Sequence, residues 1–279
     1  MLAIVAAALT LGLDACGGSG GAPASSTASS ASGPSVPSGT TELGAGVKVV
    51  WGRPGNDQSP KAVVMLIHGG SWKGIDPAAF KSTLAIATIF QNLGFETATV
   101  EYRRGAQGIN DVQRLYRQVR HRVGAHTPIC AVGTSAGGHI ALMLAVRNPD
   151  LACVIDLAGP TNLPALRTDP GGTTGYQIAL SAFGNGALTE LSPALHAGSI
   201  RAKLMLIYAA NDPLVPVAQG REMARADPRA KLIVLPPGTA PFVHTGVGAP
   251  VQRTGVDVGA NMRAQADEVR FLNAVGAAH

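Results

Sequence analysis

The chain has 279 residues and a formal net charge of +5; 46% of its residues are hydrophobic and 14% are charged. This composition excludes a disordered acidic or basic protein, a coiled coil and a collagen-like chain. Three cysteines are too few for a disulfide scaffold, and the basic residues form no recognisable nucleic-acid-binding module, so no nucleic-acid partner is expected.

Residues 1–16 are predicted to be an export signal that ends at a lipid attachment site. Residues 1–13 carry no charge, and a run of this length is shorter than the ~20 residues that span a bilayer. It fits the apolar core of a secretion signal. The sequence Leu13-Asp14-Ala15-Cys16 resembles a bacterial lipobox, in which the cysteine is lipidated. We therefore expect an exported protein attached to the membrane through Cys16, with a plain secretion signal as the alternative.

A flexible linker is predicted over residues 17–46. All but three of these residues are Gly, Ser, Thr, Ala or Pro, and such a stretch buries too little apolar surface to order itself. Residues 47–279 are then expected to form one globular domain. Its two cysteines, Cys130 and Cys153, lie in apolar runs typical of buried small side chains. The sequence allows a disulfide between them but does not establish one.

Within this domain, short apolar runs alternate with helical patterns. Strands are predicted at 47–51, 62–67, 96–102, 129–132, 153–157, 204–208 and 231–235, and helices at 77–92, 110–124, 136–148, 216–226 and 262–275. Continuous apolar runs are typical of strands buried on both faces of a parallel sheet. The alternation predicts a doubly wound α/β fold with helices on both faces, in which ligands bind at the carboxyl ends of the strands.

Two further segments stand out from this alternation. Residues 159–200 are rich in Gly, Pro, Thr and Asn and are predicted to form a cap over the site. The densest basic group falls on one predicted helix and is expected to form a solvated helix face. The alternative is that it binds an anionic membrane surface. The group comprises Arg114, Arg117, Arg120, His121 and Arg122.

The sharpest motif is Gly133-Thr134-Ser135-Ala136-Gly137, between a predicted strand and a predicted helix. A G-x-S-x-G sequence in this context indicates a nucleophile elbow, where a sharp turn lifts the serine hydroxyl above the sheet. The glycines give the room that such a turn needs. Ser135 is therefore the candidate nucleophile.

A second glycine motif, His68-Gly69-Gly70-Ser71-Trp72, follows the predicted strand 62–67. Small residues let backbone N–H groups point at a substrate oxygen, where each donor contributes ~2.7–4 kcal/mol to the transition state. The candidate oxyanion-hole donors are Gly70, Ser71 and Ala136. His68 is expected to bond the loop, and Trp72 is expected to be either a pocket wall or a loop anchor.

A nucleophilic serine needs a histidine base. His244 lies in a Gly- and Pro-rich loop after the predicted strand 231–235, late enough for the order nucleophile, acid, histidine. His139 is one turn into the elbow helix and is expected to point away from the site. His196, in the predicted cap, is the alternative base.

The base in turn needs an acid that orients it. Asp212 follows the predicted strand 204–208, so it is expected at a carboxyl end of the sheet. The alternative reading of Asp212 is a turn or cap residue before the helix 216–226.

These motifs together resemble the α/β-hydrolase superfamily, in its bacterial esterase and lipase branch with an H-G-G motif. The matching segments, in the family's order, are HGGSW (68–72), EYRR (101–104), INDV (109–112), GTSAGGH (133–139), NDPLVP (211–216) and His244. The resemblance implies a Ser135–His244–Asp212 triad that uses no metal and no other cofactor. Tyr102, Arg103 and Asp111 also match family positions, and a structural role is expected for them.

The sequence thus predicts a serine hydrolase that cleaves a small-molecule carboxylic ester through an acyl-enzyme. Only 4% of residues are aromatic, which disfavours the sugar stacking expected for polysaccharide esters. Two alternatives stay open. One is an amide or formamide hydrolase, similar to kynurenine formamidase, with the same triad, and the other is a non-catalytic hydrolase-fold lipoprotein that binds a ligand.

Overall fold

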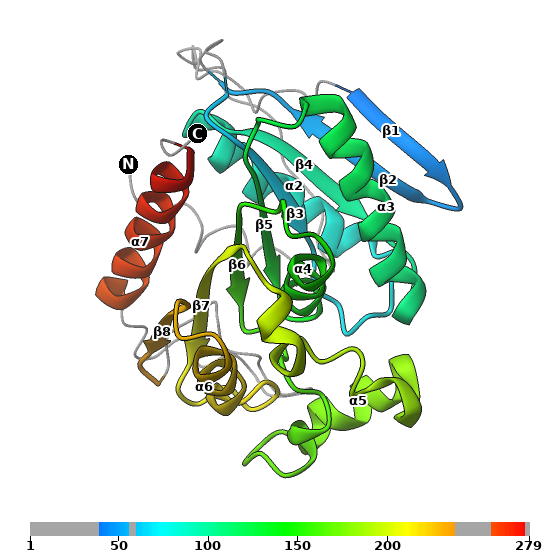
Figure 1. The fold of residues 1–279 in the computed structure, drawn as a ribbon, viewed down its shortest axis with the longest axis vertical. Coiled ribbons are helices and arrows are strands. Elements are labelled where there is room, and N and C mark those ends of the chain that lie inside the picture. The colour runs from blue at the N-terminus through cyan, green and yellow to red at the C-terminus, as the bar shows by residue number, and fades with distance from the viewer. Residues whose placement is uncertain (1–38, 56–59, 238–257, 277–279) are drawn as a thin grey trace, which may run out of the picture.

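The computed structural model describes residues 39–55, 60–237 and 258–276 (Figure 1). Their core is an eight-stranded sheet with the order β1-β2-β4-β3-β5-β6-β7-β8. Strands β3 to β8 run parallel, whereas β1 and β2 are added antiparallel at one edge. The strands are β1 Gly39–Gly44, β2 Val47–Gly52, β3 Val63–Ile67, β4 Glu96–Glu101, β5 Ile129–Thr134, β6 Cys153–Leu157, β7 Lys203–Ala209 and β8 Lys231–Leu235.

Helices cover both faces of the sheet, which confirms the predicted doubly wound arrangement (Figure 1). The helices are α2 Pro77–Asn92, α3 Gly105–Val123, α4 Ala136–Arg147, α5 Thr173–Phe183, α6 Val217–Ala226 and α7 Val258–Gly276. Apolar residues of α3, α4 and α6 pack in the core on one face, and those of α2 and α7 pack in the core on the other. Every residue of β3 and β6 is buried, as the continuous apolar runs predicted.

Two boundaries differ from the prediction. The expected linker 17–46 is wrong at its end, because Gly39–Gly44 forms β1 and pairs with β2. Ala45 and Gly46 have φ values of 51° and 76°, as a two-residue hairpin turn requires. This strand is largely exposed and carries few apolar residues, so it gave no hydrophobic pattern. Helix α3 begins at Gly105, five residues before the predicted start, because close packing on Tyr102 and Arg103 outweighs the low helix propensity of its glycines.

The predicted signal segment 1–16, with Cys16, lies outside the described residues. Within the described ranges, no helix is long and apolar enough to cross a membrane.

A disulfide joins Cys130 on β5 to Cys153 on β6. The two residues are register partners in these parallel neighbouring strands, and both are fully buried. The bond therefore fastens the strand that leads into the candidate nucleophile to its neighbour in the sheet.

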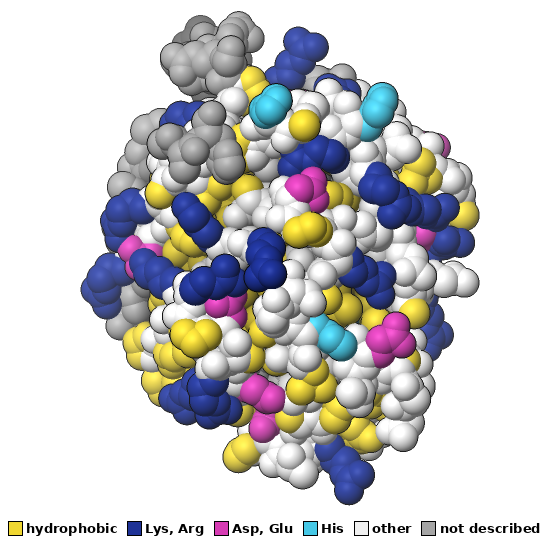
Figure 2. All heavy atoms as spheres, in the orientation of Figure 1, with side chains coloured by type: hydrophobic (Ala, Val, Ile, Leu, Met, Phe, Trp, Pro, Cys, Tyr) yellow, Lys and Arg dark blue, Asp and Glu magenta, His cyan; other side chains and the backbone are white. Residues whose placement is uncertain are grey.

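The basic residues of α3 lie mostly at the surface, in ion pairs. Arg114 pairs with Asp111, Arg120 with Asp150, and Arg122 with Glu96 at 3.5 Å. Figure 2 shows Lys and Arg side chains distributed in small groups over one face of the molecule, with Asp and Glu among them. This pattern agrees with the expected solvated helix face.

Candidate active site

Ser135 occupies a strained turn between β5 and α4. Its φ and ψ are 56° and −122°, a conformation that L-residues adopt only at an energetic cost. The Ser135 N–H donates to the carbonyl oxygen of Leu157 at 2.8 Å, and its own carbonyl accepts from the N–H of His139 at 3.0 Å. These two bonds hold the residue between the sheet and the first turn of α4.

Glycine is required on both sides of this turn. A Cβ atom at Gly133 would lie 2.2 Å from the carbonyl oxygen of Gly137, and one at Gly137 would lie 2.1 Å from that of Ile67. Both obstacles are backbone atoms, which cannot rotate away. The G-x-S-x-G pattern is therefore a steric requirement of the elbow.

The loop that follows β3 lies directly against the elbow. A Cβ atom at Gly69 would lie 2.9 Å from the carbonyl oxygen of Thr134 and 3.4 Å from Cβ of Ser135. Within the described part of the chain, the N–H groups of Gly70, Ser71 and Ala136 donate to no other residue. The structure thus brings the candidate nucleophile beside a loop whose Gly70 and Ser71 amides have no acceptor among the described residues.

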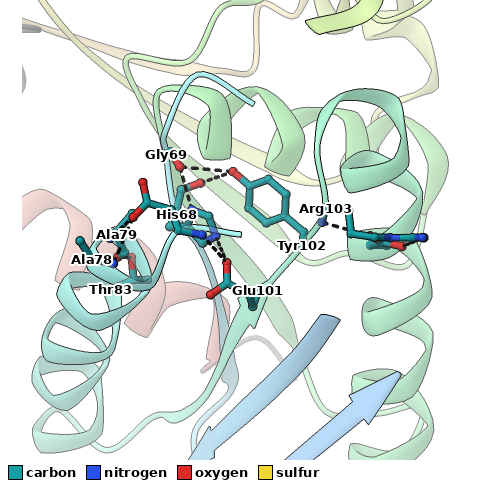
Figure 3. A network of polar contacts seen from close by, with 10 residues as sticks. His68, Gly69, Ala78, Ala79, Thr83, Glu101, Tyr102 and Arg103 are labelled. Atoms are coloured by element: carbon teal, nitrogen blue, oxygen red, sulfur yellow. Dashed lines mark hydrogen bonds and ion pairs between the residues drawn. The ribbon is translucent and has the colours of Figure 1, made fainter. Parts of the chain in front are cut away.

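A buried polar network orients this loop (Figure 3). His68 contacts Glu101 Oε1 through Nε2 at 2.9 Å and the carbonyl oxygen of Gly69 through Nδ1 at 2.7 Å. The Tyr102 hydroxyl donates to the carbonyl oxygen of His68 at 2.6 Å. Because N–H and C=O point in opposite directions across a trans peptide, the amides of Gly69 and Gly70 point away from these anchors. The expectation that His68 bonds the loop is confirmed.

The structural role expected for Tyr102, Arg103 and Asp111 is also confirmed. Arg103 donates to both carboxylate oxygens of the buried Asp111 at 2.8 Å each. Burial alone would raise the pKa of Asp111, but hydrogen bonds from Arg103 and Arg114 hold it below its usual value. This ion pair joins Arg103, just before α3, to Asp111 within that helix.

Asp212 lies at the carboxyl end of the sheet, as predicted, three residues after β7. It is buried, and its Oδ1 accepts the N–H groups of Leu214 and Val215 at 2.9 Å each. Since β6 alone separates β5 from β7, Asp212 follows a strand about 10 Å from the one that carries Ser135. The carboxylate closes its own turn, and α6 begins later, with Pro216 at its N-cap.

The segment 159–200 contains α5 and packs on the loop of Asp212. A Cβ atom at Gly175 would lie 2.4 Å from the carbonyl oxygen of Leu214. His196 is half-buried, and its buried Nε2 has no hydrogen-bond partner in the described part of the chain. His244, the predicted base, lies outside the described residues. No group of three metal-ligating side chains occurs within the described ranges.

The role of His139 was missed from the sequence. Its ring is fully buried and faces Trp72, whose Nε1–H donates to His139 Nδ1 at 3.1 Å. His139 Nε2 lies 2.7 Å from the carbonyl oxygen of Leu191. Burial lowers the pKa of His139 to about 4. Trp72 is thereby identified as a loop anchor, and the only sequence signal was that both residues close glycine-rich motifs.

The parallel sheet, the strained serine and the loops at the strand ends define an α/β hydrolase. The BD-FAE family model matches residues 52–226, and the chain belongs to this family, within the α/β-hydrolase superfamily.

Similar proteins include peptidases and esterases. Dipeptidyl aminopeptidase BIII of Pseudoxanthomonas mexicana is 25% identical over 202 residues, which is 62% of this chain and 28% of that protein. A truncated carbohydrate esterase from gut microbiota superposes with a TM-score of 0.63 at 15% identity, over 82% of this chain and 90% of the other. A puromycin-hydrolysing peptidase of Mycobacterium tuberculosis superposes with a TM-score of 0.62 at 16% identity, over 82% of this chain and 37% of the other. The chain thus spans less than a third of the curated relative, and these similarities support a hydrolase.

Proposed function

We propose that this protein is a serine hydrolase that cleaves carboxylic esters, with Ser135 as nucleophile, His244 as base and Asp212 as the acid that orients the base. The observation that carries the proposal is the position of Ser135. Ser135 has a φ of 56° in a turn that only the surrounding glycines permit. It lies beside the amides of Gly70, Ser71 and Ala136, which have no acceptor among the described residues. Such strain persists where the surrounding structure enforces it, as it does at active sites.

The reaction follows from these roles. Ser135 Oγ attacks the acyl carbon while His244 takes the hydroxyl proton. The N–H groups of Gly70, Ser71 and Ala136 bind the oxygen that becomes negative in the tetrahedral intermediate. His244 then gives its proton to the departing alcohol. Water attacks the acyl-enzyme by the same route, and the carboxylic acid leaves with the hydroxyl of Ser135 restored.

The substrate we propose is a small-molecule ester. The truncated carbohydrate esterase with a similar fold supports ester chemistry. The peptidases among the similar proteins favour a second candidate, an amide or formamide hydrolase that uses the same three residues. The two candidates differ only in the leaving group.

The experiment that separates these readings compares p-nitrophenyl esters of two, four and eight carbons with matched p-nitroanilides. Wild type is measured beside Ser135→Ala, and a serine-directed phosphonate probe reports whether Ser135 is reactive. Faster ester than anilide turnover that disappears in Ser135→Ala supports the esterase. The reverse preference supports the amide hydrolase. No turnover and no probe labelling would identify a binding lipoprotein instead.

The base is tested in the same assay. His244→Ala should abolish turnover, whereas His196→Ala should retain it. The opposite pattern would assign the base to His196, in the segment 159–200.

We further propose that the protein is exported and anchored at the membrane through a lipid on Cys16. The disulfide between Cys130 and Cys153 supports export, because disulfides persist in oxidising compartments. Cys16→Ser should move the protein from the membrane fraction to the soluble exported fraction, while Ser135→Ala should leave its partition unchanged. An unchanged partition of Cys16→Ser would reject the anchor.

A further inference from the structure

The loop that follows β3 is itself strained at residues 70–72. Gly70, Ser71 and Trp72 have φ values of 113°, 56° and 55°, all in the region that disfavours side chains. Within the loop, one turn bond joins the Lys73 N–H to the carbonyl oxygen of Gly70 at 3.0 Å. Three consecutive residues in this region need support from outside the loop to keep their amides in a single orientation.

His139 supplies that support through Trp72. The indole N–H of Trp72 donates to Nδ1 of His139, so Nδ1 carries no hydrogen. The remaining hydrogen of the neutral ring is on Nε2, which donates to the carbonyl oxygen of Leu191. Both ring nitrogens are thus used in fixed roles, and the ring cannot rotate without breaking two buried hydrogen bonds.

The same ring ties the loop to the segment 159–200. The Phe183 ring, at the end of α5, packs against Trp72 with centroids 5.1 Å apart and against His139 with centroids 5.8 Å apart. Leu191 belongs to this segment as well. Three stretches that are remote in sequence therefore meet at His139, namely the loop after β3, helix α4 and the segment 159–200.

We propose that His139 is a positioning residue, which holds Trp72 so that the amides of Gly70 and Ser71 face the reacting oxygen. Through its hydrogen bond to Leu191, His139 also fixes the position of this loop relative to the segment 159–200. The inference rests on the proposed function, because it assigns His139 to the same acyl-transfer site. Misplacement of an oxyanion donor mainly lowers kcat, since these donors act most strongly in the transition state.

The test uses three variants of the full chain with the ester substrate. Trp72→Phe keeps an aromatic side chain but removes the N–H donor. His139→Gln keeps a donor for Leu191 but withdraws the acceptor from Trp72, and His139→Asn keeps an acceptor at the Nδ1 position. We expect Trp72→Phe and His139→Gln each to lower kcat roughly 10- to 100-fold with little change in KM. His139→Asn should recover most of kcat, and the Trp72→Phe/His139→Gln double variant should be no worse than either single variant.

Trp51→Phe is the matched control. Trp51 is the other tryptophan of the chain and is equally buried, and its Nε1–H donates to Thr41 at 3.3 Å on the β1–β2 hairpin. It should leave kcat unchanged, while thermal unfolding reports whether each variant is folded. If the wild type is active, an unchanged kcat in folded Trp72→Phe or additive losses in the double variant would overturn the role of His139. The proposed function would still stand. A wild type inactive on every ester and anilide would overturn the proposed function and this inference with it.

Discussion

The phenol oxygen of Tyr208 lies between two acceptors, Asp156 Oδ2 at 2.6 Å and the carbonyl oxygen of Gly159. A phenol has one hydrogen and can donate it to only one of them. Both contacts become hydrogen bonds when the carboxyl of Asp156 carries a proton and donates it to Tyr208. Burial raises the pKa of Asp156 to about 7, against the lowering effect of hydrogen bonds from Tyr208 and Gly159. The geometry and the raised pKa thus both favour the protonated form of Asp156 below a pH of about 7.

Stability should therefore depend on pH through Asp156. The folded state holds this proton up to a pKa of about 7, whereas the unfolded chain loses it near the ordinary aspartate pKa of 3.8. Stability from this group is fully present below that lower value and is lost as pH rises through 7, a loss that reaches about 4 kcal/mol. Urea unfolding of wild type from pH 4 to 9 measures it.

Asp156→Asn keeps an acceptor for Gly159 and a donor for Tyr208 without the ionisation. We expect it to remove the share of this slope that Asp156 contributes, roughly half, because the raised pKa of Glu268 acts over the same pH range. It should also be more stable than wild type at pH 9. Asp150→Asn, at a half-exposed carboxylate on the surface, is the control that should keep the slope. An Asp156→Asn variant with the wild-type slope would assign the pH dependence to another group, such as the buried Glu268, whose pKa burial raises to about 8.

The strain at Ser135 should be measurable as a stability difference. Ser135→Gly relieves the positive φ, whereas Ser135→Ala retains a Cβ at the same angle. Relief of ~1–2 kcal/mol, less the added freedom of glycine in the unfolded chain, leaves Ser135→Gly about 0.5–1 kcal/mol more stable than Ser135→Ala. Both should lack turnover. Chemical denaturation of the pair checks this. A Ser135→Gly variant less stable than Ser135→Ala would show that the positive φ costs less than the added freedom of glycine.

The steric requirement at Gly137 has its own test. Gly137→Ala sets a Cβ against the carbonyl oxygens of Ile67 and His68, so we expect a loss of stability of ~3 kcal/mol or more. Gly186→Ala is the matched control, because nothing lies within 4 Å of the added Cβ. Thermal unfolding of the two variants compares them directly. A stable Gly137→Ala would mean that the elbow can shift, contrary to the contacts between β3 and α4.

The sequence predicted those elements whose pattern lies in neighbouring residues, and it missed the features that depend on partners remote in the chain. Continuous apolar runs gave strands β3 to β8, and Gly133 and Gly137 flank Ser135 within five residues. Strand β1 was missed, because a polar edge strand needs only its partner β2 and shows no pattern of its own. The raised pKa of Asp156 could not be predicted from the sequence for a different reason. It lies in an otherwise apolar strand, and Tyr208 reaches it from 52 residues away.

The contact between Trp72 and His139, 67 residues apart, was equally invisible in the sequence, and it gives a test that does not need a substrate. In a Trp51→Phe background, Trp72 is the remaining tryptophan of the chain, and a protonated imidazole quenches a neighbouring indole. Because burial lowers the pKa of His139 to about 4, we expect fluorescence to stay constant from pH 8 to 5 and to fall with a midpoint near that value. Trp72→Phe, which retains Trp51, should show no such transition while the protein stays folded by circular dichroism. A midpoint near the ordinary histidine pKa of ~6.5 would instead place His139 in contact with water and remove the buried hydrogen bond to Trp72.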